Sequence, residues 1–279
     1  MSTWNFSDVS TTWHITHQVG RQSFTGYRDF YAWKFFGIRY AAQPERFAHS
    51  KLFEGTGLDS AINRGADCRQ LNENVQSGSE DCLNLNIWTP YLPPSSPSKK
   101  KLKPVMFFIY GGSFITGSAN NYNIDGTNLA SRGDVVVVAL NYRVGNFGFL
   151  AFDDGVHTGN YGIGDMVTAL KWVSKNIKEF GGDPDNVTIF GESAGAVAVK
   201  ALLASPKARG LFVNVMIMSA PSGYGFAERF GDWMTVKQYA ASITRNVLNV
   251  TGCEGAGNEV GCLRGVDAST LANITLGAQ

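Results

Sequence analysis

Short apolar runs alternate with amphipathic stretches through the middle of the sequence. The run 135–140 (Val-Val-Val-Val-Ala-Leu) is almost entirely β-branched, as a strand buried on both faces should be. From about Asp165 to Phe180, apolar residues recur every three or four positions, and the glycines at 181 and 182 end this helix. The same reasoning predicts strands at 83–88, 105–110, 135–140, 187–190 and 211–218, and helices at about 165–180 and 194–204. Strands that alternate with helices indicate an α/β fold with a central, mostly parallel sheet.

Composition and charge exclude several classes of protein. Lys and Arg number 24 against 23 Asp and Glu, so we expect no global attraction to nucleic acid or anionic lipid. Pro90 to Lys103 is interpreted as a surface loop whose lysines (Lys99, Lys100, Lys101 and Lys103) form a solvated cluster. No run approaches 18 apolar residues, so no transmembrane segment is predicted. The first residues, Met1 to His17, show no signal peptide.

The cysteines and glycosylation sequons nevertheless favour an oxidising compartment. Four cysteines allow three connectivities, of which the neighbour pairing, Cys68 with Cys82 and Cys253 with Cys262, is the simplest. Their spacing contains no Cys-x-x-Cys, which argues against a zinc or redox site. Four Asn-x-Ser/Thr sequons are candidate glycosylation sites: Asn5, Asn186, Asn249 and Asn273. We therefore expect an extracellular or secretory-pathway protein whose true amino terminus is absent from this chain.

The sequence 191–195 (Gly-Glu-Ser-Ala-Gly) fits the pattern Gly-x-Ser-x-Gly. The pattern alone is a weak signal, but a predicted strand leads directly into it and a predicted helix leaves directly from it. A sharp strand–turn–helix corner of this kind is what a nucleophile elbow requires, and it would expose the Ser193 hydroxyl at the carboxyl end of the sheet. The helix beginning at Ala194 would add a positive dipole end beside a developing anion.

A second turn belongs with this corner. Gly111 and Gly112 follow the buried strand 105–110, where a flexible backbone can turn its N–H groups toward one point. The tetrahedral intermediate of ester chemistry needs such donors, and the loss of one typically costs about 3–4 kcal/mol of barrier.

These motifs resemble those of the type-B carboxylesterase/lipase family, the α/β-hydrolase group that includes the cholinesterases. The resemblance begins near Phe30, and its segments occur in family order: 36–41 (Phe-Gly-Ile-Arg-Tyr-Ala), 79–88 (Ser-Glu-Asp-Cys-Leu-Asn-Leu-Asn-Ile-Trp), 141–145 (Asn-Tyr-Arg-Val-Gly), 147–149 (Phe-Gly-Phe), 160–165 (Asn-Tyr-Gly-Ile-Gly-Asp) and 180–195, which contains the serine motif. The resemblance implies an α/β-hydrolase fold, with residues 1–279 forming the amino-terminal portion of a single domain that is truncated after the nucleophile half.

The resemblance also implies a role for particular residues. Ser193 would be the acyl-accepting nucleophile, Gly112, Ser113 and Ala194 would supply the oxyanion-hole N–H groups, and Glu192 would be a partly buried carboxylate that shapes the site. Tyr110, Phe114 and Tyr161 are candidates for the substrate pocket or for simple packing. The disulfides would be Cys68–Cys82 and Cys253–Cys262. The substrate would be a small-molecule or lipid ester, with no metal and no cofactor; the oligomeric state is not indicated.

The sequence departs from the family pattern in its histidines. The family's triad runs Ser, Asp or Glu, then His along the chain, whereas all four histidines here (His14, His17, His49 and His157) precede Ser193. We therefore expect these 279 residues to be inactive or nearly so by themselves, although a carboxylic ester hydrolase is the first interpretation. The alternative is a catalytically silent, carboxylesterase-like binding or adhesion module. The strand 211–218 is also expected to present an exposed apolar edge, prone to aggregation.

Overall fold

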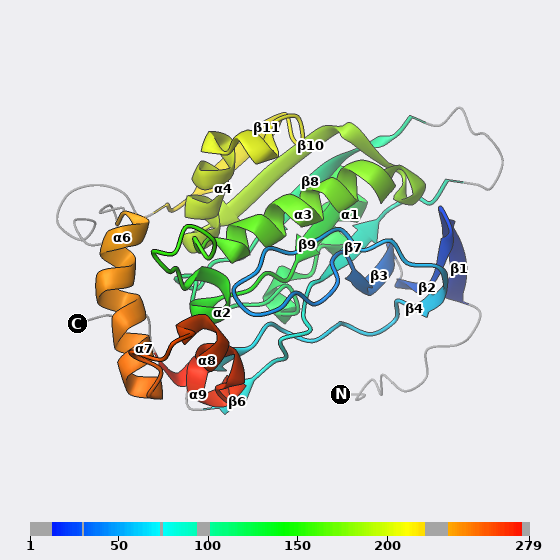
Figure 1. Cartoon of the computed structure of the whole chain (residues 1–279). Coiled ribbons are helices and arrows are strands. Elements are labelled where there is room, and N and C mark those ends of the chain that lie inside the picture. The colour runs from blue at the N-terminus through cyan, green and yellow to red at the C-terminus, as the bar shows by residue number, and fades with distance from the viewer. Residues whose placement is uncertain (1–12, 30, 73–74, 94–100, 221–233, 275–279) are drawn as a thin grey trace, which may run out of the picture.

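The computed structural model describes residues 13–29, 31–72, 75–93, 101–220 and 234–274, which build a large sheet with helices packed on it (Figure 1). In chain order the strands are β1 (His14–Val19), β2 (Gln22–Asp29), β3 (Ala32–Arg39), β4 (Gly57–Ser60), β5 (Gln70–Asn72), β6 (Val75–Ser77), β7 (Asn84–Thr89), β8 (Lys103–Ile109), β9 (Val136–Leu140), β10 (Gly182–Glu192) and β11 (Asn214–Met218). Among these described residues, nine strands share the large sheet in the order β1-β2-β3-β7-β9-β8-β10-β11, with β4 beside β2. Strands β5 and β6 pair separately.

The sheet is mixed in direction. Neighbouring strands run antiparallel from β1 across to β9 and parallel from β9 through β8 and β10 to β11. The α/β sheet is confirmed, but its parallel part is smaller than the sequence analysis predicted, because that analysis did not identify β1, β2 and β3. The turn at Gly20, with φ of 59°, joins β1 directly to β2, and strands joined by so short a connection must be antiparallel.

The central strands were predicted correctly because their composition allows burial on both faces. Every residue of β7 and of β9 is buried, and their cores are built from Leu, Ile, Val and Trp side chains. Strands β8 and β10 also lie where the apolar runs predicted them, and β10 extends further at both ends. Burial on both faces removes the period-two alternation that marks a surface strand.

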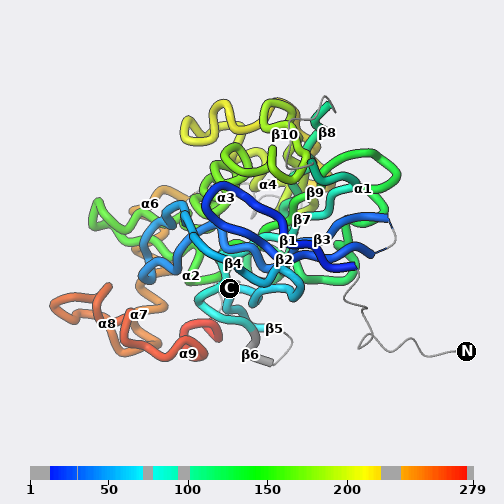
Figure 2. Tube along the Cα trace, turned by 90° about the vertical axis from the view of Figure 1, so that its right-hand side faces the viewer, coloured from blue at the N-terminus to red at the C-terminus, as the bar shows by residue number. Residues whose placement is uncertain are grey.

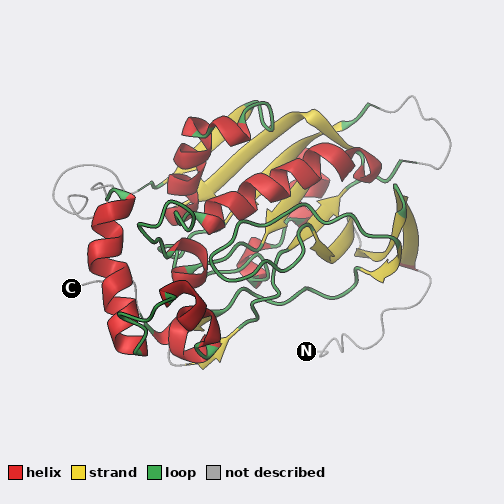
Figure 3. Cartoon of the chain, viewed as in Figure 1, coloured by secondary structure: helices red, strands yellow, loops and turns green. Residues whose placement is uncertain are grey.

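Helices cover the sheet and continue beyond it. They are α1 (Thr127–Gly133), α2 (Gly145–Phe149), α3 (Tyr161–Asn176), α4 (Ala194–Ala204), α6 (Val236–Tyr239), α7 (Arg245–Thr251), α8 (Glu259–Gly265) and α9 (Ala268–Asn273), with 3-10 turns η2 (Tyr122–Ile124), η3 (Ile177–Phe180) and η4 (Pro206–Ala208) and a π-helical turn η5 (Ala240–Thr244). The two helices α3 and α4 lie side by side over the face of the sheet that is toward the viewer in Figures 1 and 3. Within the described part of the chain, none of the helices combines the length and apolar character needed to cross a bilayer.

The boundaries of α3 and α4 follow local signals. Helix α4 has the predicted bounds, and α3 begins four residues earlier than expected, at Tyr161. The helical stretch after α3 ends at Gly181, whose φ of 82° is the left-handed conformation that stops a helix.

The helices after β11 form a second core at one end of the sheet. Figure 2 shows α7, α8 and α9 gathered beside β5 and β6, and their apolar side chains pack with those around α2. Arg46 joins this cluster to the rest of the protein: its guanidinium pairs with Glu80 at 2.7 Å and donates to the carbonyl oxygens of Leu263 and Arg264 at the end of α8. This second core had no strong signal in the sequence, since its helices are short.

Strand β11 is an edge strand of the described sheet, and it is exposed, as expected. Val215, Met216 and Ile217 are 37%, 46% and 39% exposed, because only β10 pairs with β11 among the described strands. Aggregation along this apolar edge remains a prediction.

Candidate active site

The serine of the Gly-x-Ser-x-Gly pattern forms the corner between a strand and a helix. Strand β10 ends at Glu192 and α4 begins at Ala194, so Ser193 makes the turn alone. Its φ of 55° and ψ of −120° lie in a region that residues other than glycine rarely adopt. Backbone hydrogen bonds hold it there: its N–H donates to the Met218 carbonyl at 3.1 Å, and its carbonyl accepts from the Val197 N–H at 3.1 Å. The partly buried Ser193 side chain is thus held at the carboxyl end of the parallel strands.

The two glycines of the pattern are required by close backbone packing. A Cβ on Gly191 would lie 2.5 Å from the carbonyl carbon of Gly195. A Cβ on Gly195 would lie 2.9 Å from the carbonyl oxygen of Tyr110 and closer still to that of Ile109. Because these neighbours are backbone atoms, they cannot rotate away as a side chain could. The pattern therefore lets α4 pack directly against the end of β8.

The glycine turn that follows β8 lies beside this corner. A Cβ placed on Gly111 would be only 3.1 Å from the Cβ of Ser193. The next three residues all have positive φ: 111° at Gly112, 55° at Ser113 and 59° at Phe114. Successive N–H groups in turns of this kind can converge on one concavity, where they favour an anion.

Three backbone donors near the corner make no hydrogen bond to the described part of the protein. They are the N–H groups of Gly112, Ser113 and Ala194. Ala194 is also the first residue of α4, where the helix dipole places partial positive charge. The arrangement can therefore stabilise negative charge that develops on an atom bound to the Ser193 hydroxyl.

The carboxylate of Glu192 lies at the surface, so the expectation that it is partly buried is wrong. Glu192 is the last residue of β10, and its side chain is exposed. It still borders the glycine turn, because its Oε2 is 3.1 Å from the position of a Cβ on Gly111.

Two of the three aromatic residues considered for the substrate pocket pack inside the protein instead. Tyr110 and Tyr161 are 2% and 1% exposed. Tyr110 stacks on Tyr142 with 4.2 Å between ring centroids, and each hydroxyl donates to the other residue's carbonyl oxygen, at 2.9 and 2.8 Å. Burial raises the pKa of Tyr110 far above its ordinary value. This pair anchors the start of the glycine turn, while half-buried Phe114 packs against Phe149.

Among the described residues, none of the hydrogen bonds joins a histidine ring to Ser193. All four histidines belong to the described part of the chain, and three of them contact other groups: the His17 Nε2 is 2.6 Å from the Glu179 carbonyl oxygen, the His49 ring meets Tyr161 edge-on at 5.2 Å, and the His157 Nδ1 is 2.6 Å from the Asp154 Oδ2. The Nε2 of His14 is buried and has no hydrogen-bond partner in the part of the chain that the structure describes.

The pair formed by Asp154 and His157 resembles part of a catalytic triad, but its contacts are local. Burial raises the pKa of the Asp154 carboxyl, and hydrogen bonds from the backbone and ring of His157 outweigh this effect and lower it overall. Both residues belong to the loop between α2 and α3, and the backbone N–H of Val156 also donates to Asp154. The contacts are those of a residue that closes a tight loop.

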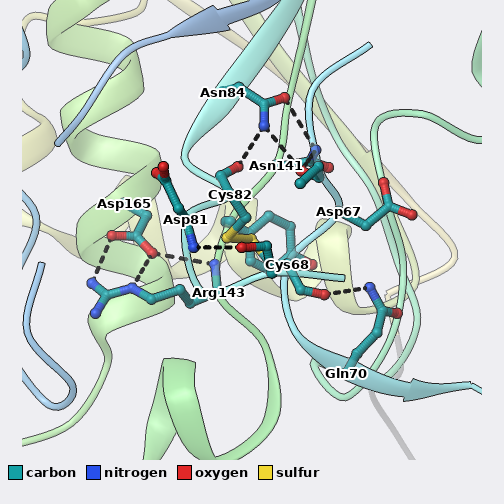
Figure 4. Close-up of a disulfide and its surroundings, with 12 residues drawn as sticks. Asp67, Cys68, Gln70, Asp81, Cys82, Asn84, Asn141, Arg143 and Asp165 are labelled. Atoms are coloured by element: carbon teal, nitrogen blue, oxygen red, sulfur yellow. Dashed lines mark hydrogen bonds and ion pairs between the residues drawn. A yellow bond between two sulfur atoms is a disulfide. The ribbon is translucent and has the colours of Figure 1, made fainter. Parts of the chain in front are cut away.

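The four cysteines form two disulfides, Cys68–Cys82 and Cys253–Cys262, the neighbour pairing favoured by the sequence. Figure 4 shows the first of them surrounded by polar side chains from several strands and loops. Within the described residues, no group of three or more His, Cys, Asp or Glu side chains is placed to hold a metal ion.

A buried asparagine network beside this disulfide was missed by the sequence analysis. Asn84 and Asn141 bond to each other at 3.2 Å, and both donate to the Ala66 carbonyl, at 2.9 and 3.1 Å (Figure 4). Asn141 also accepts from the Ala119 N–H at 2.8 Å, beyond the glycine turn. The available signal was the two asparagines that alternate with Leu85 and Ile87 in a buried strand (Asn84 and Asn86), since a buried amide must find partners.

A serine on a strand–helix corner lies beside a glycine turn, at the carboxyl ends of two neighbouring parallel strands, and this arrangement is that of the α/β-hydrolase class of fold. Comparison with known proteins is more specific: the carboxylesterase family matches residues 17–278, and the chain belongs to this family.

Two relatives and two solved structures illustrate the similarity. The para-nitrobenzyl esterase of Bacillus subtilis (strain 168) is 38% identical over 85% of this chain and 48% of its own length. The bile salt-activated lipase of Bos taurus is 37% identical over 85% of this chain and 40% of its own. A PNB esterase structure aligns with a TM-score of 0.78 and 36% identity over 94% of this chain, and a carboxylesterase from Geobacillus stearothermophilus with 0.78 and 35% over 92%. These alignments cover 53% and 52% of the two solved chains, so this chain spans about half the length of its relatives.

Proposed function

We propose that the chain carries the nucleophile and the oxyanion donors of a serine carboxylic ester hydrolase, within a single carboxylesterase domain. The observation that carries the proposal is the position of Ser193, on a strained corner with its Cβ 3.1 Å from the place a Gly111 Cβ would occupy. The substrate class is a small-molecule or lipid carboxylic ester, as the names of the relatives suggest.

The proposed reaction proceeds through an acyl-serine. The Ser193 Oγ attacks the ester carbonyl carbon, its proton passes to a base, and the carbonyl oxygen becomes an oxyanion. The N–H groups of Gly112, Ser113 and Ala194 stabilise this oxyanion, each donor being worth about 3–4 kcal/mol of barrier. When the intermediate collapses, the bond to the alkoxy oxygen breaks, the base gives its proton to that oxygen so that the alcohol leaves, and the acyl group stays on Ser193. Water then hydrolyses the acyl-serine to the acid and the free hydroxyl.

Among the described residues, none of the histidines is placed to take the proton of the Ser193 hydroxyl. A serine hydroxyl is a weak nucleophile until its proton is taken, and loss of the triad histidine costs about a millionfold in rate in a serine hydrolase. We therefore propose that the 279 residues by themselves turn over esters very slowly, with the residual rate coming from the oxyanion donors.

Imidazole added to the solution should replace the missing base. We expect a fluorophosphonate to label Ser193 slowly, and imidazole to accelerate the labelling at least about tenfold by accepting the hydroxyl proton. Ser193→Ala should abolish the labelling, whereas Ser174→Ala, on the exposed side of α3, should not change it. Peptide mass spectrometry identifies the labelled residue.

The same experiment also tests the alternative, a catalytically silent binding module. That alternative is favoured by the location of the histidines and by the exposed apolar strand β11. Labelling of Ser193 that depends on imidazole would exclude it. An unlabelled Ser193 in a folded protein would contradict the hydrolase proposal, and rapid ester turnover without imidazole, lost in Ser193→Ala, would contradict the proposed inactivity.

We also propose passage through the secretory pathway, supported by the two disulfides, since these persist in oxidising compartments. Asn249 and Asn273 are exposed, Asn186 is half-buried, and Asn5 lies outside the described residues. After secretion from a eukaryotic host, we expect an endoglycosidase-sensitive mass that Asn249→Gln reduces by one glycan. An unmodified secreted protein would contradict the glycosylation expectation.

A further inference from the structure

One buried side chain connects the Cys68–Cys82 disulfide to the glycine turn beside Ser193. Gln70 is 5% exposed, and both ends of its amide are used. Its Nε2 donates to the Cys68 carbonyl at 3.0 Å and to the Gly117 carbonyl at 2.9 Å, and its Oε1 accepts from the Gly117 N–H at 2.7 Å. Figure 4 shows this amide beside the disulfide. Because the Gln70 amide bonds to both the carbonyl and the N–H of Gly117, its orientation is fixed, and it satisfies both backbone groups of that residue.

Gly117 in turn lies against the first residue of the turn. Its φ is 120°, and a Cβ there would be 2.6 Å from the Gly111 carbonyl oxygen and closer still to the ring of Tyr110. Gly111 is the residue whose Cβ position lies 3.1 Å from the Ser193 Cβ. A continuous line of contacts therefore runs from Gln70 through Gly117 and Gly111 to the serine corner.

The segment that carries Gln70 holds the end of this turn at two further points. The Asp67 carboxylate accepts hydrogen bonds from the Ser118 hydroxyl and, at 2.6 Å, from the Asn120 amide. The intervening Cys68 is fixed by its disulfide to Cys82. Residues 67–70 thus clamp residues 117–120, while the Tyr110–Tyr142 pair anchors the start of the turn.

We propose that Gln70 is a positioning residue for the oxyanion hole: its amide holds Gly117, and through Gly117 it holds the N–H groups of Gly112 and Ser113 where they can receive the oxyanion. The inference deepens the proposed function and rests on it. Gln70 touches neither substrate nor Ser193, so its effect must pass through the conformation of residues 111–117.

Two substitutions separate the effect of the Gln70 hydrogen bonds from the effect of its side-chain volume. Gln70→Leu keeps similar volume and removes all three hydrogen bonds. In Gln70→Glu, the neutral carboxylic acid can still donate to the Gly117 carbonyl and accept from its N–H, whereas the carboxylate can only accept. Burial raises the pKa of the introduced carboxyl above its ordinary value of about 4.3. The donor is therefore present below the raised pKa and is lost as the pH rises through it.

The readouts are hydrogen exchange of residues 111–118 and imidazole-assisted fluorophosphonate labelling of Ser193, each expressed relative to the unsubstituted protein at the same pH. We expect Gln70→Leu to lose protection at Gly117 and to label about 100-fold more slowly, since displacing reacting groups by about 1 Å has effects of this size. In hydrogen exchange, Gln70→Glu should behave like the unsubstituted protein near pH 5 and like Gln70→Leu near pH 8; labelling is compared only near pH 8, where imidazole is unprotonated. Gln43→Glu, on an exposed loop, is the matched control and should change neither readout.

The outcomes distinguish the two proposals. Unchanged exchange and labelling in Gln70→Leu, or a ratio for Gln70→Glu that does not depend on pH, would overturn the role of Gln70. A fall in labelling with intact protection at Gly117 would also overturn it, because the effect would not pass through the turn. If the unsubstituted protein does not label, the proposed function fails, and the exchange data alone decide whether Gln70 holds the turn. Should Gln70→Leu not fold, the pH dependence of Gln70→Glu still tests the inference.

Discussion

Gly195→Ala is expected to destroy the serine corner and to destabilise the whole protein. The added methyl would lie 2.9 Å from the carbonyl carbon of Ile109 and closer still to its oxygen, so α4 and the end of β8 must separate. Overpacking that forces backbone segments to shift costs about 1–3 kcal/mol, and we expect about 3 kcal/mol here because two segments must separate. For a protein of this size, that corresponds to a fall in Tm of about 6–12 °C. Labelling of Ser193 should be lost as well, because the separation displaces Ser193 from the glycine turn.

Thermal unfolding followed by circular dichroism measures the first effect, and fluorophosphonate labelling measures the second. The matched control is Gly133→Ala at the end of α1, where the nearest atom to an added Cβ is 3.6 Å away. It should leave labelling unchanged and alter stability by less than about 1 kcal/mol, in the stabilising direction. A Gly195→Ala protein that melts and labels like the parent would show that α4 does not pack against β8 as described.

Asp165→Ala is expected to lower the free energy of unfolding strongly, because it removes the carboxylate of a buried ion pair. Arg143 and Asp165 have side chains 6% and 0% exposed and form two hydrogen bonds of 2.8 Å, with a third from the Arg143 N–H at 3.2 Å. Burial lowers the pKa of Arg143, but the charge and hydrogen bonds of Asp165 outweigh this and raise it overall. Removing the carboxylate leaves a buried, unpaired guanidinium, at a cost of about 3–5 kcal/mol.

Denaturant unfolding of three variants tests this expectation. Arg143→Met combined with Asp165→Leu should be more stable than Asp165→Ala, because the double variant leaves no unpaired buried charge. Glu54→Ala removes an exposed carboxylate that pairs with Lys175, and it should change stability little. Equal stability of Asp165→Ala and the parent would mean that the pair is hydrated rather than buried.

The elements that sequence analysis predicted well are those whose own residues decide their conformation. The β-branched run of β9 has one good solution, a strand buried on both faces, and Gly181 stops a helix wherever the chain goes next. The amino-terminal strands were missed because their alternation is weak. The short helices α7 to α9 were missed because they are stable only when packed on α2 and tied by Arg46.

The candidate site divides in the same way. Ser193, its glycines and the glycine turn were identifiable because the backbone conformation there restricts which residues can be used. Glu192 was expected to be partly buried and is exposed, whereas pocket lining and packing were both left open for Tyr110, and the structure shows packing. Gln70 carried no signal, because a single glutamine acquires a role only from what lies opposite it.

The sequence by itself determined a strand–serine–helix corner, a glycine turn after a buried strand, and the positions of the four histidines ahead of Ser193, because these depend on local backbone limits and on simple order along the chain. Only the tertiary structure decided that Gly111 lies against Ser193, that the disulfide segment reaches the turn through Gln70, and that none of the described hydrogen bonds links a histidine to the serine. Such contacts join residues that are 47 positions apart for Gln70 and Gly117 and 82 for Gly111 and Ser193, so they follow from how the sheet brings its strands together.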